Sequence, residues 1–143
     1  MYCSVDDILA DVTEQTAIRL TNDSDDQDGI NEALLVDKII EISRYIDTAI
    51  KSQYTVPIED EGDLAFLKPI AVSLVVCSLY QRRFPLEYSD ALSERRKQAM
   101  ADIDKVQKGI IKLTESGTVA TRPGYFMVSK RDRMFPDEDL SRY

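Results

Sequence analysis

Residues 63–83 constrain the fold more than any other stretch, because they are apolar almost all the way round a helix. The apolar residues are Leu64, Phe66, Leu67, Ile70, Ala71, Val72, Leu74, Val75, Val76 and Leu79. A helix without a polar face needs other elements around it. We therefore predict that this helix lies at the centre of a bundle and that Asp63 caps its start. Pro69 predicts either that the main helix begins there, after a short turn, or that the helix is kinked.

A second long helix is predicted over residues 31–52, where apolar residues recur every three or four positions. They are Leu35, Ile39, Ile42, Ile46 and Ile50. Asn31 is a suitable N-cap. The helix should end before Pro57, which disfavours helical backbone at Val56. We predict a structural turn here, in which Tyr54 packs beneath the loop and Pro57 fixes its course.

A third long helix is predicted over residues 86–108, after the break at Phe84-Pro85. Its expected buried side consists of Leu92, Ala99, Ile103, Val106 and Ile110. Gly109 follows the last turn, where glycine commonly closes a helix. Two short helices are predicted near the N-terminus, over residues 4–12 with Ser4 as N-cap and over residues 13–20. The expected fold class is mainly α, a small bundle of three long helices and short N-terminal ones.

The helical pattern stops at Gly109, which divides the chain into a helical domain of residues 1–109 and a C-terminal arm of residues 110–143. Gly117, Pro123, Gly124 and Pro136 predict an extended arm, with a short β-hairpin as a further alternative. The arm also carries Tyr125, Phe126, Met127, Met134 and Phe135. Apolar residues on a segment without a core suit ordering on a partner, the alternative being a plain flexible tail.

The formal net charge of −8 is unevenly distributed. Residues 1–63 hold 16 acidic and 4 basic side chains, whereas residues 64–143 hold 10 acidic and 14 basic ones. Opposite poles favour head-to-tail contact between copies, the kind of contact that closes rings, although two solvated faces would give the same split. The predicted basic contact residues are Arg82, Arg83, Arg95, Arg96, Lys130, Arg131 and Arg133. Arg82 and Arg83 either neutralise a neighbour's carboxylates or are simply solvated.

The composition disfavours catalysis and cofactor binding. The sequence has no histidine, so it lacks the usual general base at neutral pH and the commonest metal ligand. It also has no glycine-rich phosphate loop. Cys3 and Cys77 are too few for a disulfide framework, and we expect free thiols in a reducing cytoplasm. No uninterrupted apolar run approaches the ~20 residues of a membrane span. We predict a protein that is not an enzyme, without metal, cofactor or membrane contact.

The region around residues 21–30 is an acidic loop containing Asp23, Asp25, Asp26 and Asp28. Its spacing is not that of a calcium-binding EF-hand loop. With Gly29 at the sixth position of such a loop, Leu35 would occupy the twelfth position, where a glutamate must bind the ion. Sequence-specific nucleic-acid recognition is also disfavoured, because the basic run at residues 130–133 lies on a chain with a pI of about 4.6.

Several short motifs occur in a fixed order along the chain. They are Val5-Asp6-Asp7-Ile8-Leu9, Tyr54-Thr55-Val56-Pro57-Ile58, Leu79-Tyr80-Gln81-Arg82-Arg83, Gln107-Lys108-Gly109-Ile110-Ile111-Lys112-Leu113 and Ser129-Lys130-Arg131. In this order they resemble the Mu-type phage neck protein family, over nearly the whole chain. The acidic residues 22–28 resemble an insertion relative to the family pattern.

The resemblance implies a structural virion protein, a head–tail connector (adaptor) assembled in the bacterial host cytoplasm and located in the neck. It implies a ring of about a dozen copies between the portal and a tail or stopper protein, through which DNA passes without sequence recognition. In such a channel the carboxylates of Asp23, Asp25, Asp26 and Asp28 would repel DNA phosphates. The alternative function is a small partner-binding or regulatory helical module that docks through its C-terminal arm.

Overall fold

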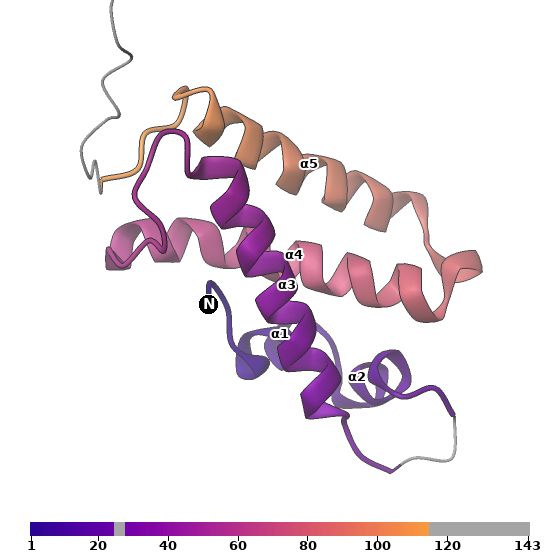
Figure 1. Ribbon diagram of the computed structural model, residues 1–143. Coiled ribbons are helices and arrows are strands. Elements are labelled where there is room, and N and C mark those ends of the chain that lie inside the picture. Colours follow the sequence, from indigo (N-terminus) through magenta and orange to yellow (C-terminus); the bar gives the residue numbers. More distant parts are fainter. Residues whose placement is uncertain (25–27, 115–143) are drawn as a thin grey trace, which may run out of the picture.

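The computed structural model describes residues 1–24 and 28–114. Within these ranges the chain forms helices and no strands (Figure 1). The helices are α1 (Val5–Asp11), α2 (Glu14–Thr21), α3 (Glu32–Ile50), α4 (Glu61–Arg83), the short 3-10 helix η1 (Pro85–Glu87) and α5 (Asp90–Gln107). The predicted mainly α bundle is confirmed. A hairpin in the arm would lie outside the described residues.

Helix α4 is the centre of the bundle, as its apolar surface predicts. α1, α2, α3 and α5 all pack against it, and α3 crosses it in Figure 1. By length and composition α4 as a whole is apolar enough to cross a membrane, although it contains no uninterrupted apolar run of that length. In the structure, 56% of its most apolar stretch is buried by the rest of the chain. That burial is what the central helix of a bundle requires.

Side chains cap the starts of α1 and α3 where the sequence predicts them. The Ser4 hydroxyl accepts a hydrogen bond from the Asp7 amide at 3.2 Å, and the Asp7 carboxylate accepts one from the Ser4 amide at 2.8 Å. This reciprocal pair closes the first turn of α1. The Asn31 side chain accepts a hydrogen bond from the Leu34 amide at 3.1 Å and so caps α3.

The start of α4 differs from the prediction, because Asp60 and not Asp63 is its cap. The Asp60 carboxylate accepts hydrogen bonds from the amides of Gly62 at 3.0 Å and Asp63 at 3.1 Å. The helix can therefore begin at Glu61, since its first free amides are already satisfied. Asp63 is instead buried in the first turn, where its carboxylate accepts a hydrogen bond from the Thr114 amide at 2.9 Å.

Pro69 lies inside α4 on its exposed side. The helix runs as one element from Glu61 to Arg83, so the prediction that the main helix starts at Pro69 is wrong. A proline has no amide hydrogen, so residue 69 donates no bond to the carbonyl of Ala65. The Pro69 carbonyl in turn accepts a hydrogen bond from the Ser73 hydroxyl at 2.8 Å.

Helix α5 begins later than predicted. Residues 85–87 form η1, and the Ser89 hydroxyl caps α5 by accepting a hydrogen bond from the Leu92 amide. The predicted buried positions Ala99, Ile103 and Val106 are buried, and Leu92 is half-buried. Ile110, however, is 70% exposed. The reason is Gly109, whose φ of +70° turns the chain away from the helix path.

Leu113, four residues beyond the predicted boundary at residue 109, packs against the helical domain. Leu113 is buried, and its amide donates a hydrogen bond to the Tyr54 hydroxyl at 3.2 Å. Tyr54 is half-buried and its hydroxyl lies 3.5 Å from the Ile111 carbonyl oxygen. The side chain at the predicted turn thus holds the chain after α5, while Pro57 is exposed and follows a cis peptide bond.

Tyr2 ties the N-terminal segment to the core and is only 3% exposed. Its amide donates a hydrogen bond to the Ser43 hydroxyl on α3 at 3.2 Å. Its own hydroxyl donates to the Asp47 carboxylate and accepts a hydrogen bond from the Ile58 amide at 3.3 Å. One side chain therefore joins the N-terminal segment, α3 and the loop before α4.

Candidate functional site

The acidic loop is closed at its base by polar side chains. The Asn22 side-chain amide donates hydrogen bonds to the carbonyls of Ile18 and Gly29. The buried Thr21 hydroxyl accepts a hydrogen bond from the Asn31 amide at 3.1 Å. Of the predicted channel-lining residues, Asp23 and Asp28 are exposed. Asp25 and Asp26 lie outside the described residues.

Arg82 and Arg83 hold this loop against the C-terminal end of α4. Arg82 forms an ion pair with the Asp23 carboxylate, and Arg83 donates a hydrogen bond to the Asn22 carbonyl at 2.9 Å. The guanidinium of Arg83 also lies 4.9 Å from the centre of the Phe84 ring. Both side chains are thus engaged within their own chain, and contact of either with a neighbour's carboxylates stays a prediction. Residues 22–23 and 82–83 are far apart in the sequence, so the sequence alone did not indicate that they are in contact.

Arg95 and Arg96 also make contacts within the chain. Two nitrogens of Arg95 donate to the Asp11 carboxylate at 2.8 and 2.9 Å, and its Nε donates to the Ser73 hydroxyl at 3.0 Å. Arg95 thereby links α5 to both α1 and α4. Arg96 donates to the Gln81 side chain at 2.7 Å. The other predicted contact residues, Tyr125, Phe126, Met127, Lys130, Arg131, Arg133, Met134 and Phe135, lie outside the described residues.

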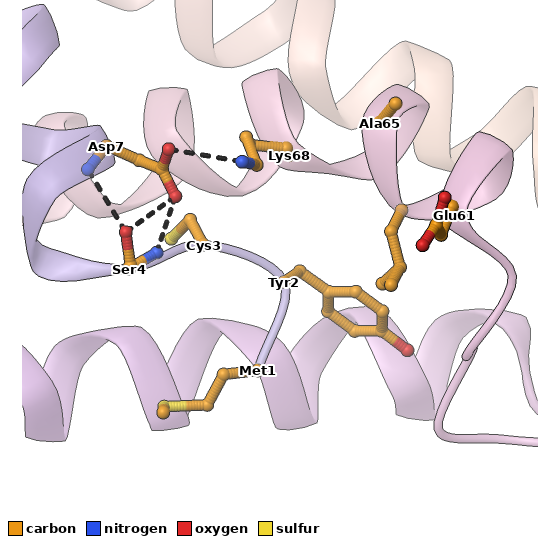
Figure 2. A pocket seen from close by; sticks show the side chains of 9 residues that line it. Met1, Tyr2, Cys3, Ser4, Asp7, Glu61, Ala65 and Lys68 are labelled. Carbon is orange, nitrogen blue, oxygen red and sulfur yellow. Dashed lines mark hydrogen bonds and ion pairs between the residues drawn. The ribbon is translucent and has the colours of Figure 1, made fainter.

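A groove over the first half of α4 is the surface that the sequence analysis missed. It consists of three adjoining clefts of about 610, 420 and 320 Å³. Ala65 lines the first and second clefts, and Pro69 lines the second and third. We call this surface the α4 groove. It runs from the N-terminal segment, seen beside α4 in Figure 2, to the space between α4 and α5.

The rim of the α4 groove carries charges that are paired with one another. Lys68 lies 3.2 Å from the Asp7 carboxylate (Figure 2), and Lys105 lies 2.8 Å from that of Asp102. The pKa of Asp7 is lowered, first by the hydrogen bond from the Ser4 amide. The pKa of Asp102 is lowered, first by the hydrogen bond from Lys105. Both carboxylates therefore stay ionised at neutral pH.

The floor of the groove is apolar, with Ala65, Phe66, Pro69, Ile70 and Val72 among its residues. Among the described residues, no group of three or more histidine, cysteine or acidic side chains is arranged to hold a metal ion. An apolar floor between paired charges is suited to binding a protein segment. The sequence predicted that α4 lies at the centre of the bundle. The groove exists because α1 and α5 leave this part of it uncovered.

Cys3 lines the first cleft, and its thiol is buried. Burial, followed by the nearby Asp7 charge, raises the pKa of Cys3 from 9.0 to about 11. Burial also raises the pKa of Cys77. Both cysteines are free, as predicted.

We expect two consequences of the raised pKa of Cys3. At pH 8 its thiolate fraction in the folded chain is about 0.1%, so iodoacetamide should alkylate it at least about tenfold more slowly than in the urea-unfolded chain.

Because the pKa of Cys3 in the folded chain exceeds its value in the unfolded chain, the stability that the buried thiol contributes is complete below pH 9 and is lost as the pH rises toward 11. Melting temperatures measured from pH 8 to pH 11 should fall less for Cys3→Ala than for the unmodified chain. Equal falls would contradict the assignment.

Comparison with known families places the chain among phage proteins. Residues 2–129 match the family described as Bacteriophage Mu, Gp36. The chain belongs to the bacteriophage Mu Gp36 family. The match begins at the buried Tyr2 and includes every described helix, so the Gp36 family pattern covers the whole bundle and the α4 groove. It confirms the resemblance to a Mu-type phage family that the sequence motifs indicate. No curated protein matches the chain.

Proposed function

We propose that this Gp36-family protein is a head–tail connector subunit, located in the virion neck and assembled as a ring beneath the portal. The observation that carries the proposal is the family match over residues 2–129, which makes the chain a phage protein. The resemblance to Mu-type neck proteins supplies the specific role. The acidic first part and basic second part of the sequence support head-to-tail contact between neighbouring copies.

Fewer carboxylates of the acidic loop are available to repel DNA than the sequence predicted. Asp23 is paired with Arg82, so its charge is partly neutralised within the subunit. Repulsion of DNA phosphates in a channel would then depend mainly on Asp25, Asp26 and Asp28. Arg83 holds the base of the loop at the end of α4 through its hydrogen bond to the Asn22 carbonyl.

A deletion experiment in the phage or prophage that encodes this chain separates a connector from a regulatory module. Without a connector, we expect DNA-filled heads and complete tails that do not join, seen by electron microscopy of the lysate. Purified wild-type particles should contain the protein, detected by mass spectrometry at several copies per particle. Normal joined particles from the deletion strain, or particles without the protein, would contradict the proposal and favour the partner-binding alternative.

A direct binding assay tests the ring. The full chain is mixed with the purified portal protein of the same phage and followed by sedimentation velocity. We expect a complex containing several copies of this chain for each portal ring, because ring interfaces repeat with the symmetry of their template. A chain that stays free at a large excess of portal and of tails would contradict a connector role.

A further inference from the structure

The α4 groove begins close to the point where the described chain ends. The Thr114 amide is bound to the carboxylate of Asp63, in the first turn of α4. Glu61, Leu64 and Ala65, from the same two turns, line the first cleft of the groove. Residues 115–143 therefore start at the same end of the central helix as the groove.

The sequence between Thr114 and Tyr125 is long enough to reach the groove floor. Successive residues of a helix point about 100° apart, so Asp63 and Ala65 lie on nearly opposite sides of α4. The chain must pass around a helix of roughly 10–12 Å diameter. Residues 115–124 span up to about 33 Å when extended. A path around the helix end is well within this length.

The chemistry of the arm matches that of the groove. Tyr125, Phe126 and Met127 are three consecutive large apolar residues, and aromatic rings gain the most from covering an apolar floor. The groove offers small floor residues, Ala65 and Pro69, over which large side chains can lie. The basic side chains of its rim, Lys68 and Arg95, are already paired with Asp7 and Asp11.

The charges near the groove also suit the arm. The acidic lining residues are Asp7, Asp11, Glu61 and Asp102, against the basic Lys68 and Arg95. Lys130, Arg131 and Arg133, with one acidic residue among them, follow the apolar triplet in sequence. Because Asp7, Asp11 and Asp102 are paired with Lys68, Arg95 and Lys105, the acidic lining residue left to attract these basic side chains is Glu61, at the start of the groove.

We propose that residues 125–127 of the chain's own arm dock in the α4 groove, over Ala65 and Pro69. The contact is intramolecular, because a short tether gives the arm an effective concentration in the millimolar range beside its own groove. It does not depend on the connector role and would hold for any function of the chain.

Disulfide trapping tests the proposal. In the full chain with Cys3→Ala and Cys77→Ala, we would combine Ala65→Cys with Val128→Cys, next to the apolar triplet. The control combines Val128→Cys with Thr48→Cys, which is exposed on the last turn of α3. We expect the Ala65 pair to form a disulfide within one chain at least tenfold faster than the control pair, measured by non-reducing gels and intact mass. Equal rates, or only cross-links between copies, would overturn the proposal.

A second measurement keeps both native cysteines and so avoids the altered core. Methyl NMR spectra of the full chain are compared with those of the triple variant Tyr125→Ser, Phe126→Ser and Met127→Ser. We expect the Ala65 and Val72 methyl signals to shift, and that of Ala33, exposed on α3, to stay in place. Unchanged signals at Ala65 and Val72 would show that the triplet does not occupy the groove.

Discussion

Replacing Tyr2 with alanine is expected to lower the free energy of unfolding by about 3–5 kcal/mol, the usual cost of removing a large buried aromatic side chain. The ring is 3% exposed, so its loss leaves a cavity in the core. The hydroxyl bonds to Asp47 and Ile58 are lost with it. Urea unfolding followed by circular dichroism measures the effect.

Tyr2→Phe separates the hydroxyl from the ring. It should cost about 1–3 kcal/mol, because the Ile58 amide and the Asp47 carboxylate then lose a buried partner. Tyr45→Phe is the matched control on α3. Tyr45 is 42% exposed, and its hydroxyl contacts only the Met100 sulfur among the described interactions. If Tyr2→Phe and Tyr45→Phe lower the free energy of unfolding by the same amount, the Tyr2 hydroxyl does not have the role given to it.

Pro69→Ala is expected to act in the opposite direction and to raise the free energy of unfolding by up to about 3 kcal/mol. Proline in a helix interior is disfavoured relative to alanine by about that amount. The alanine amide restores a donor for the Ala65 carbonyl, and Pro69 is exposed among the described residues, so its ring contributes little to the packing of the bundle. Thermal unfolding followed by circular dichroism measures the change.

Pro85→Ala is the control for this substitution. Pro85 is exposed at the first position of η1, where the missing amide hydrogen costs little. Its replacement should change the stability by much less than that of Pro69. If Pro69→Ala is no more stable than Pro85→Ala, the helix has already compensated for the proline, and the predicted penalty is wrong.

The helices could be predicted from the sequence because their signals are local. The apolar repeat from Leu35 to Ile50 and the caps at Ser4 and Asn31 involve residues within one or a few turns. The start of α4 was harder, because Asp60 and Asp63 are both good caps and lie three residues apart. In the structure the Asp63 carboxylate instead accepts a hydrogen bond from the Thr114 amide, which is far away in sequence.

The surfaces could not be predicted, because they depend on residues far apart in sequence. Nothing near Arg82 in the sequence indicates that Asp23 is its partner, or near Arg95 that Asp11 is. The α4 groove is harder still. The apolar positions of α4 predict burial over most of its surface, and the placement of α1 and α5 decides which part remains open.

The contacts at Leu113 and Thr114 have a mechanical consequence. Any tension applied to the C-terminal residues reaches the bundle first through the hydrogen bonds to Tyr54 and Asp63. Asp63 belongs to the central helix α4, so the force is applied directly to the helix against which all the other described helices pack. A pull on the end of the chain is thus resisted by the whole bundle and not by the last turn of α5 alone.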